Sequence, residues 1–176
     1  TPAVDPSINE AADASAQALN ESGTITFADA EDTNLTITGA ASATVTAGSG
    51  VSVPSDLQTA LAAAFSVTDN NDNTAGWTLS TAGLDLDFLA EGQTITLAYV
   101  VTATDDNGAS VTDTITATIT GTNEAPTVST PAVDPSINEA ADASAQALNE
   151  SGTITFADAE DTNLTITGAA SATVTA

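Results

Sequence analysis

The amino-acid sequence contains no lysine, arginine or histidine, whereas its 176 residues include 24 aspartates and glutamates and give a formal net charge of −24. Because no side chain carries a positive charge, ion pairs between side chains cannot form. Nucleic acid is excluded as a partner, since phosphate contacts require lysine or arginine. The same deficiency disfavours binding to an anionic membrane surface.

Cysteine is also absent, so disulfides and thiolate-bound metals are excluded. No apolar run approaches the roughly 18 residues that a membrane-spanning helix needs, and we expect no membrane partner. Hydrophobic residues nevertheless make up 41% of the chain. They alternate with threonine in regular runs, which argues against the disorder that a high net charge can produce.

A long exact repeat organises the sequence. Residues 1–47 recur letter for letter at 130–176, with an offset of 129 residues. This period exceeds the roughly 20–50 residues of solenoid units and matches the size of a whole domain. Because residue 1 falls inside a repeat, we expect the sequence to be a piece of a longer tandem array of nearly identical domains.

Alternation of apolar residues with threonine or serine predicts strands that turn one face toward a core. The clearest runs are 23–29, 34–47, 94–104 and 109–120. Asn107 and Gly108 lie between the last two runs and are a strong hairpin signal, since both central residues of such a turn need a positive φ. One helix is expected over 56–64, with Ser55 as its cap. The whole pattern predicts an all-β antiparallel sandwich with one short helix.

Aromatic residues are few, with one tryptophan, one tyrosine and four phenylalanines in the chain. We expect the large aromatic side chains of the repeat to fill the core: Phe27, Phe65, Trp77, Phe88 and Tyr99. Trp77 has a second interpretation as a platform for a sugar ring. A single tryptophan within a strand is more often a core residue, which favours the first interpretation.

Three stretches resemble VCBS-type repeats, which belong to the wider group of cadherin-like and Ig-like bacterial modules. They are "SGTITFADAEDT" at 22–33, "LDFLAEGQTITLAYVVTATDDNG" at 86–108 and "ITGTNEAP" at 119–126. The resemblance covers most of one period and is weakest over 40–75. It implies an extracellular β-sandwich of the Ig/cadherin-like kind, strung in tandem and commonly stiffened by calcium. Such repeats occur in very large secreted bacterial adhesins of the RTX type, often exported by type I secretion, and the resemblance does not imply an enzyme.

The same resemblance places the domain boundary. Its closing motif at 122–126 is a linker, so residues 1–125 form a nearly complete domain and 126–176 form the first strands of the next. Those strands lack the partners that bury a core. We therefore expect either 1–47 or 130–176 to make its main sheet hydrogen bonds outside its own chain, by strand exchange with another copy, and we favour 130–176.

Acidic residues gather in two loops that the strand order brings together. If successive strands alternate in direction, the loop at 29–34 and the turn at 105–108 both lie at the end of the domain where the preceding linker arrives. We call this the upstream end. Hard cations bind about six to eight oxygens, and the absence of histidine and cysteine disfavours zinc and copper. Calcium fits better than magnesium, which demands a small octahedral shell.

We therefore expect a calcium site at the upstream end of each domain, built from these two loops and from the equivalents of Asn123 and Glu124 in the linker of the preceding copy. The second copy of the first loop would contribute to the site of the next domain. The expected ligands are Asp29, Glu31, Asp32, Asp105, Asp106, Asn123, Glu124, Asp158, Glu160 and Asp161. Without a cation, several of these carboxylates would repel one another at short range. The alternative is that they are solvated turn residues, since aspartate side chains readily bond the local backbone.

Two further acidic features are less specific. Glu10 is another candidate ligand, with no end of the domain assigned to it. Asp69, Asn71 and Asn73 alternate like the ligands of a calcium loop, but Thr74 replaces the turn glycine and Ser80 replaces the bidentate glutamate. We expect an ordinary polar loop there.

These observations favour a calcium-stabilised structural extender, or spacer, of a secreted adhesin on the bacterial cell surface. Its partners would be the neighbouring repeats of the same chain, and no enzymatic activity is expected. The alternative is a calcium-dependent carbohydrate-binding module of the same adhesin, using Trp77. Exact duplication favours the extender, because identical domains extend reach additively, although repeated binding domains would gain avidity.

Overall fold

The computed structural model describes residues 5–10, 17–130, 138, 141 and 151–168. The chain divides into two compact units, unit 1 (Thr1–Glu124) and unit 2 (Ala125–Ala176). The described residues are mostly β structure with one short helix, which confirms the expected class at this level. The described residues contain no helix that is long and apolar enough to span a membrane. That 1–125 and 126–176 are separate folding domains stays a prediction.

The larger sheet of unit 1 is built on β7 (Thr94–Thr104) and β8 (Ser110–Thr120), which pair antiparallel over their whole length. β3 (Thr36–Gly39) and β4 (Thr44–Ala47) follow one another along the other edge of β7. β1 (Ser7–Asn9) pairs in parallel with the end of β8. The sheet is therefore mixed, and the expectation of a purely antiparallel structure is wrong at β1.

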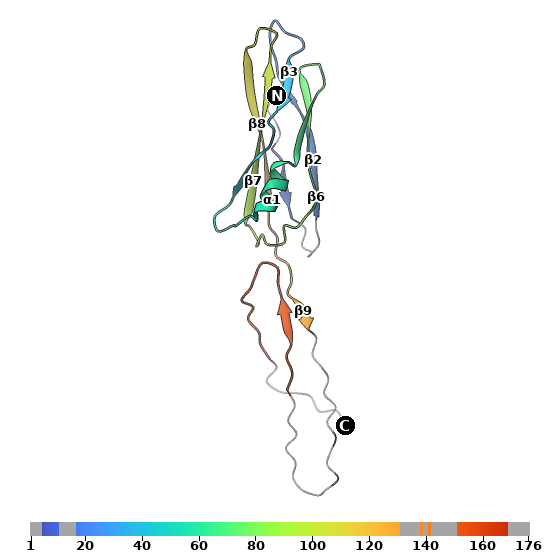
Figure 1. Cartoon of the computed structure of the whole chain (residues 1–176), viewed down its shortest axis with the longest axis vertical. Helices are drawn as coiled ribbons and strands as arrows, with labels where there is room; N and C mark the ends of the chain where they lie inside the picture. Colours follow the sequence, from blue (N-terminus) through green and yellow to red (C-terminus); the bar gives the residue numbers. More distant parts are fainter. Residues whose placement is uncertain (1–4, 11–16, 131–137, 139–140, 142–150, 169–176) are drawn as a thin grey trace. The chain divides into compact units, whose positions relative to one another are not determined.

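The smaller sheet of unit 1 has the order β2-β6-β5. β6 (Thr74–Leu84) pairs antiparallel with β2 (Gln17–Thr26) on one side and with β5 (Phe65–Asp69) on the other. In Figure 1, the β7–β8 ladder and the β2–β6 ladder run along opposite flanks of unit 1. The runs expected at 23–29, 94–104 and 109–120 correspond to β2, β7 and β8, whereas the run at 34–47 is divided into β3 and β4.

The helix α1 (Ser55–Ala62) connects the two sheets, since it contacts both β4 and β6. It buries Leu61 completely. The expected helix is confirmed, but the role given to Ser55 is wrong. Pro54 occupies the N-cap position, where its carbonyl oxygen accepts a hydrogen bond from Gln58 N (2.8 Å), and no side chain caps the helix.

A single core lies between the sheets. β7 alternates between buried and more exposed residues along its whole length, as the period of two in its sequence predicts. The core cluster draws on both sheets and on α1; its largest fully buried members include Ile25, Leu61, Leu79, Ile95, Leu97, Ile115 and Ile119. Burial of each such side chain is worth about 1.5–3 kcal/mol.

The expected aromatic core is confirmed for four of its five members, Phe27, Phe65, Trp77 and Tyr99, whereas Phe88 is only partly buried. Phe65 of the smaller sheet stacks on Tyr99 of the larger one, with ring centroids 5.2 Å apart. Trp77 is 3% exposed. Its indole is therefore a core side chain and presents no ring face to a sugar.

Tyr99 fixes the bend between β3 and β4. Its ring covers Gly39 so closely that a Cβ at Gly39 would collide with the ring, and its hydroxyl donates a hydrogen bond to Ala40 O (2.7 Å). Burial raises the pKa of Tyr99, so the phenol keeps this proton well above neutral pH. The bend lets two short strands share one edge of β7.

The turn between β7 and β8 differs from the two-residue hairpin expected at Asn107 and Gly108. Thr104 pairs with Ser110, so the loop spans Asp105–Ala109. Within it only Gly108 has a positive φ, of 87°. Asp105 Oδ1 accepts hydrogen bonds from Asn107 N (2.9 Å) and Ala109 N (2.8 Å), which stabilises the longer loop.

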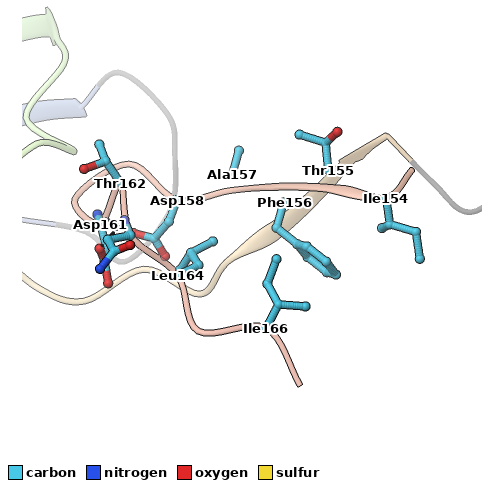
Figure 2. A pocket seen from close by; sticks show the side chains of 10 residues that line it. Ile154, Thr155, Phe156, Ala157, Asp158, Asp161, Thr162, Leu164 and Ile166 are labelled. Atoms are coloured by element: carbon cyan, nitrogen blue, oxygen red, sulfur yellow. Dashed lines mark hydrogen bonds between the residues drawn. The ribbon is translucent and has the colours of Figure 1, made fainter. Parts of the chain in front are cut away.

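Unit 2 pairs β9 (Thr127–Thr130) antiparallel with β10 (Thr155–Ala157). Its apolar residues are more exposed than the identical residues of unit 1. Ile154 is 46% exposed, whereas its counterpart Ile25 is 0% exposed. Figure 2 shows the side chains of Phe156, Leu164 and Ile166 turned toward one another across an open hollow.

The core side chains of the repeat therefore need the strands that follow residue 47 to cover them. Residues 5–10 and 17–47 have these strands within their own chain, since β1 pairs with β8, β2 with β6, and β3 and β4 with β7. Strand exchange by 130–176 with another copy stays a prediction.

We predict that completing the second period will cover the apolar face of unit 2. The chain should bind a hydrophobic dye such as ANS, because Ile154 and Ile166 are exposed. Appending the sequence of residues 48–129 after Ala176 should remove most of the dye fluorescence. A matched control carries aspartate at the appended counterparts of Ile95 and Ile115, and it should keep the fluorescence high. Unchanged dye binding after correct completion would contradict this account of the fold.

Candidate functional site

The loop after β2 is held in place by its own aspartates. Asp29 Oδ1 accepts hydrogen bonds from the backbone N–H groups of Glu31 (2.8 Å) and Asp32 (2.9 Å). Asp32 Oδ1 accepts a third from Asn34 N (2.8 Å). These bonds take the place of the basic side chains that the sequence lacks, because a backbone amide is the donor that remains available to a carboxylate.

The same loop forms in unit 2, which has different surroundings. Asp158 Oδ1 accepts hydrogen bonds from Glu160 N (3.2 Å) and Asp161 N (2.8 Å), and Asp161 Oδ1 accepts one from Asn163 N (2.7 Å). The local sequence is therefore sufficient to set this conformation, as expected for turns in which an aspartate bonds the next backbone amides.

The two backbone hydrogen bonds to Asp29, first that from Glu31 and then that from Asp32, lower the pKa of its carboxyl below 3.8. A carboxyl whose folded-state pKa is depressed contributes stability above its unfolded pKa and loses that contribution as the pH falls through the folded value. For Asp29 this loss lies below pH 3.8. Asp29 is thus charged across the neutral range.

Asp32 joins the two acidic loops of the upstream end. Its second carboxylate oxygen, Oδ2, accepts a hydrogen bond from Asp106 N (3.2 Å), across 74 positions of sequence. Asp29 and Asp105 line one hollow at the same end, whereas the side chains of Glu31 and Asp106 are exposed. The expected convergence of the loops is confirmed, and their binding of a metal stays a prediction.

The loop between β5 and β6 also reaches the upstream end, and it carries more than the sequence suggested. Asp69 Oδ2 accepts a hydrogen bond from Ile37 N (2.9 Å), and Asn73 Oδ1 accepts one from Leu35 N (2.7 Å). Asn73 Nδ2 donates to Asp32 O (3.2 Å). Two side chains of the smaller sheet thereby tie down the start of β3, which belongs to the larger sheet.

Three acids are buried at the opposite end of unit 1, where β8 ends and the linker leaves; we call this the downstream end. Glu10, Asp87 and Glu124 are the only acids among the buried residues of the described chain, at 2%, 9% and 6% exposure. Asp87 Oδ1 and both carboxylate oxygens of Glu124 are shielded from solvent. Sequence reasoning named Glu10 and Glu124 but missed Asp87, although its place between the apolar residues Leu86 and Phe88 was a signal of burial.

Glu10 fastens the N-terminal segment to the end of β8. Its backbone N–H donates to Thr120 O (2.9 Å). Its Oε2 accepts a hydrogen bond from Thr122 N (3.0 Å), and its carbonyl oxygen accepts one from the Thr122 hydroxyl (3.0 Å). The structure thus assigns Glu10 to the downstream end.

Asn123 and Asp87 belong to the same end. Asn123 is exposed and donates from Nδ2 to Glu124 O (2.7 Å). Asp87 lies two residues before Leu89. The carbonyl oxygen of Leu89 is so close to Gly121 that a Cβ on Gly121 would collide with it. The close approach of these two backbones requires a glycine at position 121 and packs the segment after β6 against the linker.

All the candidate donors are oxygens, which suits a hard cation. Within residues 5–10, 17–130 and 151–168, however, no group of three or more acidic side chains is already arranged to hold a metal ion. At the upstream end the carboxylates face backbone amides rather than a common centre. A cation would therefore have to draw these side chains together on binding.

Comparisons with known proteins give no family assignment. No protein-family description matches the sequence, and no curated protein or solved structure was found to resemble it. The similarity to VCBS-type repeats rests on the three quoted motifs.

We predict that Asn73 contributes to stability through its side chain as well as its backbone. Asn73 and Asn71 both have a left-handed backbone, with φ of 63° and 59°. Asn73→Ala should lower the free energy of unfolding by about 1–3 kcal/mol more than Asn71→Ala, because it leaves Leu35 N and Asp32 O without their partner. Urea unfolding followed by the fluorescence of Trp77, the only tryptophan of the chain, measures this in unit 1. Equal losses would show that the cost is backbone strain alone.

Proposed function

We propose that the chain is a calcium-stabilised structural extender of a secreted bacterial cell-surface adhesin, with a mechanical and non-enzymatic role. Three features support this proposal: the exact 129-residue repeat, the β-rich unit with its own core, and the acids at both ends of that unit. An array of such units extends additively and places whatever it carries at a distance from the cell.

The finer fold assignment, an Ig/cadherin-like sandwich, is part of the same proposal. Two sheets that contribute to one core support it. So does the parallel pairing of β1 with β8, which brings the first and last strands of the unit side by side. In that arrangement the chain enters at one end and leaves at the other, as an extender requires.

The observation that carries the calcium proposal is the burial of Glu10, Asp87 and Glu124 at one end of a chain without basic side chains. Moving an ionised carboxylate out of water costs several kcal/mol unless a cation or hydrogen-bond donors compensate. Glu10 receives the donors of Thr122. A divalent cation bound at this end would stabilise the charge of these carboxylates, and the exposed Asn123 offers a further oxygen ligand.

Calcium suits these residues better than other metals do. The chain contains neither histidine nor cysteine, the ligands that zinc prefers. Calcium also accepts a flexible shell of carboxylate, amide and carbonyl oxygens, which fits side chains that are not yet arranged around a centre. Such a site binds weakly, in the range of ~10⁻⁴–10⁻³ M that is typical of extracellular modules.

The carbohydrate-binding alternative loses its main support, because Trp77 is buried under the smaller sheet. The indole packs against Gly23, where a Cβ would be 2.8 Å from the ring. No other tryptophan is present in the sequence to stack on a sugar.

We predict that calcium raises the melting temperature of unit 1, as followed by Trp77 fluorescence. Free calcium at about ten to a hundred times the dissociation constant should add roughly 1.4–2.7 kcal/mol per site. Glu124→Gln should abolish most of this response. It should also raise stability in chelator, because a neutral amide costs less to bury than a carboxylate that binds no cation.

Two control variants separate the ends of the unit. Asp106→Asn tests the upstream loops, and a reduced calcium response there would add a second site. Glu21→Gln changes an exposed acid in the middle of β2, where it pairs with Leu79, and should leave the response unchanged. Identical melting curves of the native chain in calcium and in chelator would refute the calcium proposal.

We also predict that calcium stiffens the linker. A protein with several complete repeats should show a larger maximum dimension by small-angle scattering in calcium than in chelator, since bound calcium would restrict Asn123 and Glu124. Each period carries 17 of the acids and no base. An array that is equally extended in chelator at 0.5 M salt would mean that neither calcium nor charge repulsion sets its length.

A further inference from the structure

The strands of unit 1 divide between the repeated and the unrepeated parts of the sequence. Residues 1–47 supply β1, β2, β3 and β4, and within the described residues each of these lies at the edge of its sheet. The strands with neighbours on both sides, β6, β7 and β8, all come from residues 48–124, which we call the inner segment. The inner segment also pairs its own strands, β5 with β6 and β7 with β8. Removing the repeated residues would therefore break no pairing within the inner segment.

The sequence contains a second set of these edge strands. Residues 130–176 are identical to 1–47, so every contact that the first copy makes with the inner segment is also available to the second copy. For example, the amide of Ile37 donates to an aspartate of the inner segment, and the counterpart of Ile37 in the second copy is Ile166.

The second copy leaves the same side chains exposed. Ile154 and Ile166 are 46% and 66% exposed, whereas their counterparts Ile25 and Ile37 are 0% and 4% exposed. Burial of these isoleucines requires the inner segment, and the sequence contains one inner segment for two copies. The two copies are therefore competitors for the same partner.

The connection between the inner segment and the second copy is long enough for an exchange within one chain. β1 runs parallel to the last residues of β8, and just before β1, Asp5 Oδ1 accepts a hydrogen bond from Thr116 N (2.9 Å). The counterpart of Asp5 is Asp134, so residues 121–133 would have to lead from the end of β8 back to the level of Thr116, roughly 13 Å away. A segment of that length reaches about 43 Å when extended.

The first copy nevertheless has an advantage, because the exchange would separate β9 from β10. The counterparts of β10 are Thr26–Ala28, which lie at the upstream end, whereas β8 ends at the downstream end. The length of β8, eleven residues, separates the two ends by roughly 36 Å. The chain from Thr120 to Thr127 reaches only about 25 Å. The second copy would therefore replace the first only when the first is weakened.

We infer that the exposed apolar face of unit 2 is a docking surface for the inner segment of its own chain. Residues 130–176 can replace 1–47 as the source of the edge strands, and the first copy is then released as far as Gly48. In the tandem array proposed above, the same exchange would shift the frame of folding by one repeat. The inference depends on the identity of the two copies and holds whether or not calcium binds.

The test weakens one copy at a time in the full chain, with thermal unfolding followed in chelator by Trp77 fluorescence. Trp77 belongs to the inner segment and packs against Gly23 of the first copy, so its emission reports a docked copy. Ile25→Asp should retain a cooperative transition, because the second copy still carries Ile154. Ile25→Asp combined with Ile154→Asp should lose the transition or melt roughly 10 °C or more below the single variant. Equal melting of the single and double variants would overturn the inference.

Two further variants are matched controls. Ile115 is 0% exposed like Ile25, but it belongs to the inner segment and has no second copy, so Ile115→Asp should abolish the transition. Ile154→Asp alone should leave the native melting temperature unchanged, because the first copy remains intact. Loss of the transition in Ile25→Asp, as in Ile115→Asp, would contradict replacement by the second copy.

The mass of the Ile25→Asp variant separates exchange within one chain from exchange between chains. Light scattering should give the mass of one chain, and the melting temperature should be independent of protein concentration. A dimer, or a melting temperature that rises with concentration, would show that the edge strands come from another molecule and would overturn exchange within the chain.

Discussion

Hydrogen bonds from backbone amides to carboxylates hold together a protein that has no basic side chain. In unit 1 they close the loop after β2, the turn between β7 and β8, and the loop between β5 and β6. Each is a charge-assisted bond and stronger than a bond between neutral groups. Because the donors are backbone groups, the bonds fix main-chain conformation directly, and the acids that make the chain so highly charged are also what orders its turns.

Similar bonds connect the two sheets, with one carboxylate and one side-chain amide as acceptors. Asp69 and Asn73 extend from the smaller sheet and accept the amides of Ile37 and Leu35 at the start of β3. Those amides lie on the side of β3 away from β7, where an exposed strand edge would otherwise invite pairing with another chain. The polar loop between β5 and β6 thus covers the edge of β3 and joins the two sheets. Phe65 and Tyr99 make an apolar contact between the same sheets.

The strands could be predicted wherever the pattern is local and regular. β7 was expected at 94–104 and lies at Thr94–Thr104, because its alternation of apolar and polar residues is complete. The cap of α1 was mispredicted, since Pro54 and not Ser55 occupies the N-cap position. The β7–β8 turn was mispredicted as well, because hydrogen bonds to the carboxylate of Asp105 stabilise a longer loop. Burial is not a local property: Ile25 and Ile154 have the same flanking sequence and opposite exposure. The apolar neighbours of Asp87 signalled its burial, but its place at the downstream end depends on which backbone segments meet at Gly121.

The parallel pairing of β1 with β8 has a consequence for how the unit would carry force. β1 follows the N-terminal segment, and its partner, the last part of β8, leads directly into the linker. Opposite pulls on the two ends of unit 1 therefore act along these neighbouring strands, so that the hydrogen bonds between them are loaded together in shear rather than opened one at a time. Glu10 lies at the end of this ladder and adds its bonds to Thr120 and Thr122. Under such a load, the β1–β8 ladder would resist extension until its hydrogen bonds break together.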